Sequence, residues 1–395
     1  MRPDLQRSFI ERVSAETHAE VCAQMQSVLG VPVEFRVCET PIFVSHEMRR
    51  QLEDAAIAIT LQSARPTTLA HTTRLIDEEV RVRQESDRPL FSVVDFAITM
   101  SDDGTFVPRL IELQGFPSLF GYQLLYTSQM RAVYGLDDST PFLSDLSYDS
   151  YSALLRECII GGHDADNVAL VELDPLRQKT RPDFIALEKM IGLKTVDIRD
   201  VYRDGRQLVH TDARGQKHVL RRIFNRAIVD ELRDHHVHLN FRWDDDLDVE
   251  WAGNPNWYFL MSKSSMPYLD HPTVPRSMFL NEIDELPADL DRYVLKPLYA
   301  FAGKGVIVGP THHDVAVIPA ADRHLWILQE RVTYARCIPT PHGDNAVEIR
   351  VMCLWPDRFS EPLPVMSLAR TGRGAYMGAG YNTEPWTGSS GCLFV

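Results

Sequence analysis

The sequence predicts a fold of the mixed α/β and α+β classes, and two kinds of pattern support this. Residues 167–200 contain a strand pattern, a helix pattern and a second strand pattern, an order typical of a parallel α/β unit. Residues 91–123 and 293–308 each contain two β-prone runs joined by a turn or loop, which predicts antiparallel hairpins. With 395 residues, the chain is long enough for two or three domains.

The composition excludes several classes of protein. The formal net charge is −14, whereas a general nucleic-acid binder usually carries a basic face. Residues 1–16 lack the apolar core of a signal peptide, and no run approaches the roughly 18 apolar residues of a membrane span. The six cysteines lie far apart without a CxxC pair, which favours reduced thiols over disulfides or a zinc site. We therefore expect a cytoplasmic protein that contacts neither nucleic acid nor a membrane.

The N-terminal segment is expected to be structural. Residues 8–30 have helical spacing with one broad apolar face, and Gly30 marks the expected end of this helix. Residues 33–37 have the pattern of a short strand. Ser45 is placed to cap a helix that continues to about Ser63.

The hairpin within residues 91–123 carries three polar side chains that suit a divalent metal ion. Its strands, FSVVDFAITM and FVPRLIELQ, flank the turn SDDGT and carry Asp95 on the first strand and Glu112 and Gln114 on the second. Glu112 and Gln114 are two positions apart, so they share one face of the sheet. Carboxylate and amide oxygens suit Mg²⁺, which usually also binds substrate phosphates. The same pattern also fits the polar outer face of an ordinary hairpin.

The predicted α/β unit leads into two polar clusters. NVALVELDP is its first strand, residues 182–191 are its helix and KTVDIRD is its second strand. A hairpin pattern then leads to an arginine-rich run that suits either a substrate carboxylate or a solvated strand edge. The histidines that follow fit a surface loop better than a metal site. These residues are Arg221, Arg222 and Arg226, then His235, His236 and His238.

Two lysines are candidates for binding phosphate. Residues 254–269 begin with a turn and continue as a helix pattern with Lys263 near its middle. Lys296 lies on the first strand of residues 293–308, before a glycine-containing loop. Glycines let a backbone approach phosphate oxygens, and ammonium groups neutralise their charge. The loop lacks the Lys-Ser or Lys-Thr pair of a Walker motif, and it also fits a hairpin with an exposed lysine. The loop residues of interest are Gly303, Lys304 and Gly305.

Three strand patterns near the C-terminus end in polar residues. HLWILQERV becomes polar at Gln329 and Glu330, which favours a nucleotide hinge whose backbone groups face an adenine edge. AVEIRVMCLW carries Glu348 and Arg350 on one face, and PVMSLARTG ends near Arg370. A glycine-rich tail follows.

Together, these motifs resemble the ATP-grasp superfamily in a circularly permuted order. An ATP-grasp chain usually presents the helix lysine, the strand lysine, the glycine loop, the hinge and the glutamate strand before the metal-binding hairpin. Here the hairpin with Glu112-x-Gln114 comes first, which is similar to glutathionylspermidine synthetase and eukaryotic glutathione synthetase. The likeness covers most of residues 90–395, and residues 168–226 also resemble the pre-ATP-grasp domain of that group.

The resemblance implies an ATP-grasp fold, α/β and α+β, with a small parallel-sheet pre-ATP-grasp domain. Residues 1–150 would contain the N-terminal helices and the metal-binding hairpin, 151–253 the pre-ATP-grasp substrate domain, and 254–395 the nucleotide-binding lobes. The implied Mg²⁺ ligands are Asp95, Glu112 and Gln114, and the implied catalytic residues are Arg350 and Arg370. The implied ATP-binding residues are Lys263, Lys296, Gly303, Lys304, Gly305, Gln329, Glu330, Val332 and Glu348.

The implied reaction joins a small-molecule carboxylate to an amine. ATP phosphorylates the carboxylate, and the amine then displaces phosphate to form an amide. An amino acid, a peptide or a polyamine fits these roles, and a homo-oligomer remains open. Two alternatives also remain open, namely an ATP-dependent phosphotransferase and an ATP-binding pseudoenzyme that acts as a partner subunit.

The chain departs from the family at the metal site. Gln114 replaces the usual Asn, and the sequence after Lys296 lacks the glutamate of the permuted synthetases. Two alternatives are open: the metal site is weaker, or it uses Asp95 or Glu384 instead. The glycine-rich segments 299–305 and 370–391 are expected to close over bound nucleotide.

Overall fold

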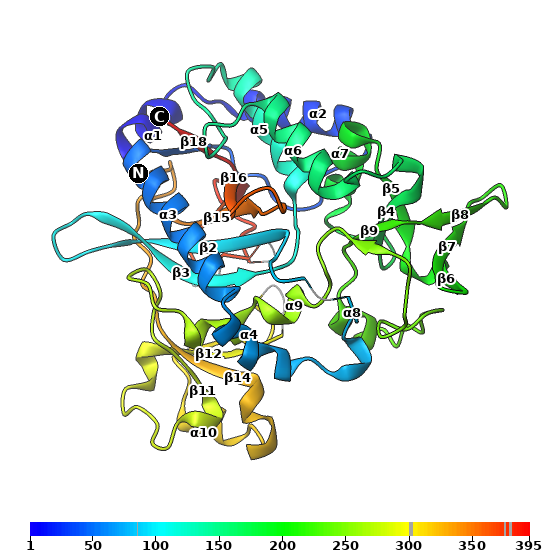
Figure 1. Cartoon of the computed structure of the whole chain (residues 1–395). Coiled ribbons are helices and arrows are strands. Elements are labelled where there is room, and N and C mark those ends of the chain that lie inside the picture. Colours follow the sequence, from blue (N-terminus) through cyan, green and yellow to red (C-terminus); the bar gives the residue numbers. More distant parts are fainter. Residues whose placement is uncertain (85, 300–302, 375–376, 379–380) are drawn as a thin grey trace.

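A five-stranded antiparallel sheet lies at the centre of the molecule (Figure 1). The computed structural model describes residues 1–84, 86–299, 303–374, 377–378 and 381–395. The predicted hairpin 91–123 supplies two neighbouring strands, and the first of them pairs with a strand that the chain reaches more than 200 residues later. In spatial order the sheet contains β17 (Gly388–Ser390), β16 (Leu363–Gly372), β15 (Ala346–Leu354), β2 (Phe91–Met100) and β3 (Phe106–Gln114).

A second sheet is parallel throughout. The predicted strand–helix–strand segment forms β4 (Val168–Glu172), α7 (Arg181–Ile191) and β5 (Lys194–Asp197), with β4 and β5 paired in parallel. The second strand is shorter than expected because Ile198–Asp200 forms a 3-10 turn, in which the Asp197 side chain accepts a hydrogen bond from the backbone N–H of Arg199. The sheet is completed by β9 (Arg222–Asn225) beside β4 and β10 (Glu250–Trp251) beside β9.

A third sheet forms the lower part of the molecule in Figure 1. Residues 293–308 form the predicted hairpin, in which β12 pairs with β13 around the loop. One face of this sheet packs in a small apolar core that includes Leu295 and Leu328, and the other faces the central sheet. In spatial order the strands are β11 (Ser277–Phe279), β14 (Trp326–Glu330), β12 (Tyr293–Pro297) and β13 (Ile307–Val308).

The N-terminal segment differs from its prediction in two places. The single helix expected over residues 8–30 is two helices, α1 (Pro3–Ile10) and α2 (Ala15–Leu29). The break occurs because the Ser14 side chain accepts a hydrogen bond from the backbone N–H of Thr17, which caps a new helix. Residues 33–37 form no strand, and Val37 makes only an isolated bridge with Ser389. The helix predicted from Ser45 is α3 (His46–Ser63), as expected.

The predicted helix over residues 254–269 is also interrupted. Residues 257–260 form a short helix, α9 (Trp257–Leu260), and Lys263 then begins a 3-10 helix (Lys263–Tyr268). Two features favour the break. Ser262 accepts a hydrogen bond from the backbone N–H of Ser264, and Pro267 has no backbone N–H for an α-helical hydrogen bond. Lys263 therefore lies at the start of a tight turn and not in the middle of an α-helix.

Helices cover the central and parallel sheets. Figure 1 shows α5, α6 and α7 grouped together, and α3 crossing the strands of the central sheet. The largest apolar core contains side chains of α3, β2, β15 and the parallel sheet. No helix in the described part of the chain has the length and apolar composition needed to cross a membrane. The remaining α-helices are α4 (Pro66–Thr72), α5 (Phe120–Tyr134), α6 (Tyr148–Ile160), α8 (Val229–Asp234) and α10 (His312–Ala316).

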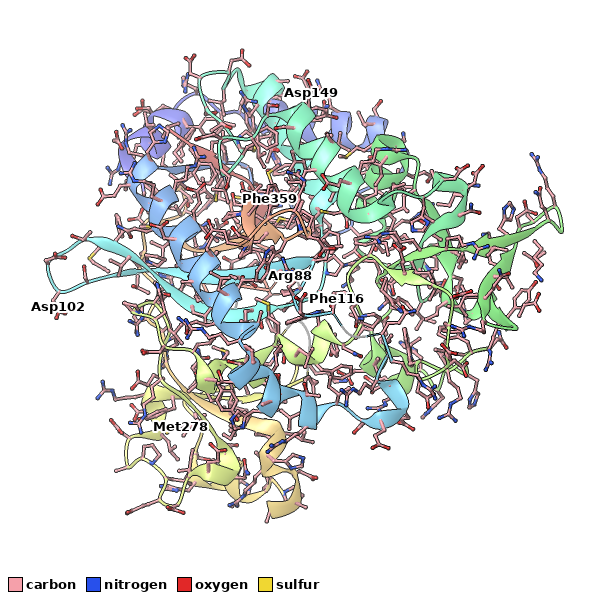
Figure 2. The ribbon with its side chains drawn as sticks, viewed as in Figure 1. Arg88, Asp102, Phe116, Asp149, Met278 and Phe359 are labelled. Atoms are coloured by element: carbon pink, nitrogen blue, oxygen red, sulfur yellow. The ribbon has the colours of Figure 1, made fainter. Side chains whose placement is uncertain are left out.

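Two smaller sheets complete the fold. The strands β1 (Ile42–Val44) and β18 (Cys392–Phe394) pair in parallel. The backbone N–H of Arg2 donates a hydrogen bond to the backbone oxygen of Phe43, so both ends of the chain meet at this sheet. The strands β6 (Val201–Asp204), β7 (Gln207–Thr211) and β8 (Lys217–Leu220) form an antiparallel sheet. In Figure 2, Asp102 marks the tip of the β2–β3 hairpin, which projects from the molecule, and Met278 marks the third sheet.

Candidate active site

A cavity of about 520 Å³ lies between the central sheet and the third sheet. Its walls come from β3, β15 and β16 on one side and from β12, β13 and β14 on the other. This volume is in the range of small-molecule sites. Among the residues that the structure describes, six basic side chains and three acidic ones line the cavity, so it suits an anionic ligand. The basic residues are Lys263, Lys296, Arg331, Arg336, Arg370 and Arg373, and the acidic residues are Glu112, Glu330 and Glu348.

Two buried lysines approach the cavity from different elements. Strand alternation places Lys296 on the same face of β12 as Val294, which also lines the cavity. The Lys296 ammonium donates a hydrogen bond of 2.9 Å to the backbone oxygen of Ile111. Burial lowers the pKa of Lys296 to about 8, although the nearby Glu112 carboxylate opposes this shift. Burial also lowers the pKa of Lys263.

Asp95 is part of a buried ion network and does not line the cavity. Arg350 lies directly opposite Asp95 on the next strand and donates hydrogen bonds of 2.6 and 2.7 Å to its two carboxylate oxygens. Arg370 donates a third, of 2.6 Å, to Oδ2. Burial by itself would raise the pKa of Asp95, but the two arginines lower it to about 2. This geometry differs from the prediction that Asp95 binds a metal ion, because both of its oxygens already accept hydrogen bonds from guanidinium groups.

Arg370 connects this network to the cavity. It lies opposite Glu348 on the neighbouring strand and is paired with the carboxylate of that residue. The Tyr334 hydroxyl donates a hydrogen bond of 2.8 Å to the other Glu348 oxygen. Burial raises the pKa of Glu348, as do the like charges of Asp95 and Glu112, while Arg370 opposes the shift. Burial by itself would lower the pKa of Arg370, but the Glu348 and Asp95 carboxylates raise it.

Only one of the two predicted metal ligands on β3 lines the cavity. Glu112 lines the cavity, whereas Gln114 does not, and the Gln114 amide donates a hydrogen bond of 3.1 Å to the Glu112 carboxylate. The suggested substitute Glu384 is exposed and pairs with Arg373 at 2.8 Å. Within the part of the chain that the structure describes, no cluster of three or more histidine, cysteine or acidic side chains is arranged to hold a metal ion.

Among the described residues of the glycine loop, Gly303 and Val306 line the cavity. Gly303 lines it with φ of 77°, and Gly305 has φ of 74°, a conformation that side chains rarely adopt. Lys304 instead pairs with Asp234 at 2.9 Å and is exposed. The two segments predicted to close over nucleotide include residues 300–302, 375–376 and 379–380, which lie outside the described residues.

The predicted hinge also reaches the cavity. Gln329 and Glu330, at the end of β14, line it together with Val332. In total, nine of the residues predicted from sequence line one cavity. They are Glu112, Lys263, Lys296, Gly303, Gln329, Glu330, Val332, Glu348 and Arg370. The structure does not bring five others to its surface, and these are Asp95, Gln114, Lys304, Gly305 and Arg350.

Several cavity residues were not recognised from sequence. Tyr334 and Arg336 belong to residues 331–345, where no regular element provides a periodic pattern. Arg336 donates a hydrogen bond of 2.7 Å to the backbone oxygen of Arg373, which links this segment to the C-terminal tail. The only available signal was the high density of arginine and aromatic residues directly after the hinge.

Two arginines of the run before residue 227 contact other parts of the fold. Arg222 pairs with Glu250 at 2.7 Å and donates hydrogen bonds to backbone oxygens of α6. Arg226 is buried between the rings of Phe116 and Phe184, which lie 5.1 and 5.7 Å from its guanidinium carbon. It is therefore not a solvated strand edge. Figure 2 shows Phe116 near the centre of the molecule.

Comparisons with known proteins identify the fold. No protein-family model matches the sequence, and no curated protein matches it. A glutathione synthetase-like effector from Globodera pallida, solved in apo form, aligns with a TM-score of 0.62 at 13% identity, over 96% of this chain and 96% of the effector. The two proteins share one fold. A candidate gamma-glutamylcysteine synthetase from Methylobacillus flagellatus aligns over 89% of this chain and 90% of its own at 14% identity, with a TM-score of 0.41.

Proposed function

We propose that this protein is an ATP-dependent carboxylate–amine ligase. The observation that carries this proposal is the cavity between two sheets, where lysines and arginines outnumber carboxylates among the described lining residues and the two lysines are buried. Phosphoryl transfer depends mainly on positioning and charge neutralisation, and this lining supplies both. The fold that this chain shares with a glutathione synthetase-like effector is consistent with this chemistry.

We further propose that the fold is a circularly permuted ATP-grasp fold. The β2–β3 hairpin lies in the same sheet as β15 and β16, although it precedes them by more than 200 residues. Residues 1–150 and 254–395 would then build the ATP-grasp core together, and residues 151–253 would form the substrate domain. The ligase would act in the cytoplasm on small molecules.

The lysines would hold the phosphates of ATP. Burial lowers the pKa of Lys263 and of Lys296, so each ammonium is poorly stabilised before a ligand arrives. A phosphate group beside them favours their charged forms. The affinity for an anion is therefore coupled to proton uptake by these side chains.

Glu112 and Glu348 are the residues that would hold Mg²⁺. Both carboxylates line the cavity, and their mutual repulsion contributes to the raised pKa of Glu348. Two protein carboxylates are enough for Mg²⁺, which takes its remaining ligands from phosphates and water. When bound, the ion would neutralise charge on the phosphates. In this structure Arg370 and Tyr334 already bind the two Glu348 oxygens, so Glu348 would have to give up one of these partners to bind the ion.

The reaction would proceed in two steps. An oxygen of the substrate carboxylate attacks the γ-phosphorus of ATP, and ADP leaves with the electrons of the broken P–O bond. The amine nitrogen then attacks the acyl carbon, phosphate leaves and the nitrogen loses a proton, which gives the amide. Arg370 lines the cavity and is fixed by Asp95 and Glu348, so its guanidinium is positioned to stabilise charge on the transferred group.

The experiment is an assay of ADP release with pooled amino acids, peptides and polyamines, followed by mass spectrometry of the products. The expected result is ADP release that needs a carboxylate and an amine together, with a product whose mass corresponds to their condensation. A stable phosphoester formed from a single substrate would instead identify a phosphotransferase. Nucleotide binding without ADP release in any mixture would identify a pseudoenzyme.

A further inference from the structure

Both oxygens of the Glu348 carboxylate have partners in the cavity wall. The Tyr334 hydroxyl donates a hydrogen bond of 2.8 Å to Oε2, and Arg370 pairs with Oε1. All three side chains line the cavity. A cation and a hydrogen-bond donor compete for the lone pairs of a carboxylate oxygen. A divalent cation can therefore use Glu348 fully only when one of the two donors leaves it.

Arg370 is held more firmly than Tyr334. Its guanidinium also donates a hydrogen bond of 2.6 Å to Asp95, and it lies on β16, which pairs with β15. Tyr334 belongs to residues 331–345, which contain no helix or strand. Among the residues that the structure describes, Glu348 is the only hydrogen-bond partner of its hydroxyl. Rotation of Tyr334 breaks one hydrogen bond, whereas movement of Arg370 breaks contacts with two carboxylates, so the tyrosine is the partner that can leave.

Tyr334 is also placed where a bound nucleotide would meet it. It follows the hinge directly along the chain, and the hinge residues Glu330 and Val332 line the same cavity. Its side chain borders a space of about 520 Å³. The backbone N–H of the next residue, Ala335, donates a hydrogen bond of 2.8 Å to the backbone oxygen of Ile98 on β2, which fixes the main chain. A ligand in the cavity therefore acts on the side chain of Tyr334 and not on its backbone.

We propose that the Tyr334 hydroxyl occupies the cation position on Glu348 while the cavity is empty, so that a divalent cation binds tightly only together with a nucleotide. This inference rests on the proposed function, in which Glu112 and Glu348 hold the ion. The nucleotide displaces the tyrosine side chain, which frees Oε2 of Glu348. Its phosphate oxygens also add ligands that two carboxylates do not supply.

The test measures Mn²⁺ binding without nucleotide, with electron paramagnetic resonance to count the free ion. Tyr334→Phe keeps the ring but removes the hydroxyl, so its affinity for Mn²⁺ should be about tenfold higher than that of the unmodified protein, the effect of one hydrogen bond to a charged group. A merely structural role of Tyr334 predicts the opposite sign. Equal or weaker Mn²⁺ binding by a folded Tyr334→Phe protein would overturn the inference but leave the ligase proposal intact.

Two further variants assign the gain to one contact. Tyr202→Phe is the matched control, because its hydroxyl lies 3.0 Å from Thr211 Oγ1 outside the cavity, and it should bind Mn²⁺ like the unmodified protein. Glu348→Gln in the Tyr334→Phe background should abolish the gain, since the carboxylate is then absent. A gain that persists in this double variant would place the ion elsewhere and overturn the inference.

A second measurement tests the link to the nucleotide. The affinity for a non-hydrolysable ATP analogue is measured by titration calorimetry with and without Mn²⁺. The strengthening by Mn²⁺ should be about tenfold smaller in Tyr334→Phe than in the unmodified protein, because the two ligands no longer share the cost of moving the tyrosine. Equal strengthening in both proteins would overturn the inference. Failure of the unmodified protein to bind the analogue at all would overturn the proposed function itself.

Discussion

Arg350 on β15 donates two hydrogen bonds to the Asp95 carboxylate on β2, although 255 positions separate the two residues. Both side chains are buried, with exposed side-chain fractions of 7% and 1%. Removing one partner of a buried ion pair leaves an uncompensated charge, which is far more destabilising than loss of an exposed pair. The network therefore makes direct predictions about stability.

Asp95→Asn should destabilise the protein by roughly 3–5 kcal/mol, the usual cost of leaving a buried charge without its partner. The variant keeps the shape of the side chain but leaves Arg350 and Arg370 facing a neutral amide. The measurement is urea denaturation followed by circular dichroism. Glu157→Gln is the control, because it breaks the exposed pair with Arg358 and should leave the midpoint nearly unchanged. Equal midpoints for both variants would contradict a structural role of Asp95.

The stability contributed by Asp95 should depend on pH in the acid range. Its pKa is about 2 in the folded protein, below the ordinary value of 3.8. A depressed folded pKa means that this contribution is fully present above about pH 4 and is lost as the pH falls toward 2. The free energy of unfolding of the unmodified protein should therefore decrease over this interval more steeply than that of Asp95→Asn. Parallel pH profiles of the two proteins would refute this assignment.

Lys296→Met should weaken ATP binding by at least about tenfold, since a buried ammonium contact to phosphate is worth more than a neutral hydrogen bond. The fold should persist, because methionine fills a similar volume. Nucleotide affinity is measured by titration calorimetry and folding by thermal denaturation. Lys194→Met, which removes an exposed lysine paired with Asp166, should leave the affinity unchanged. A folded Lys296→Met protein with normal affinity would exclude Lys296 from the phosphate site.

ATP affinity should fall as the pH rises through about 8, the pKa of Lys296 in the ligand-free protein. Below this pH the lysine is charged and attracts phosphate, and above it the lysine is neutral. At pH 8, binding should be accompanied by proton uptake, because phosphate favours the charged form. Calorimetry in two buffers with different ionisation enthalpies measures this uptake. Lys296→Arg should remove it, since arginine stays charged, and persistent uptake would point to another group.

The sequence predicted the strands that form the site better than it predicted the contacts between the side chains of the site. Runs of β-prone and hydrophobic residues predicted β2, β3, β12, β14 and β15, and Asp-Gly and glycine signals marked the turns of the two hairpins. The prediction of a continuous helix around Lys263 was wrong, because Ser262 and Pro267 interrupt the helix locally, although both residues are visible in the sequence. The partners of Asp95 were not predictable, because they depend on which distant strand lies beside β2. Polar residues on a strand indicate a site, but the neighbouring strand decides whether each one meets a ligand or an arginine.

The pairing of β2 with β15 also constrains how the chain folds during synthesis. When a ribosome has made the β2–β3 hairpin, the strand that covers its free edge is still more than 200 residues away. Until β15 emerges, the Asp95 carboxylate lacks its arginines and the apolar edge of β2 is open to other chains. Contacts of such long sequence separation also slow folding. The central sheet of the nascent chain can therefore close only after β15 has left the ribosome, long after the β2–β3 hairpin has emerged.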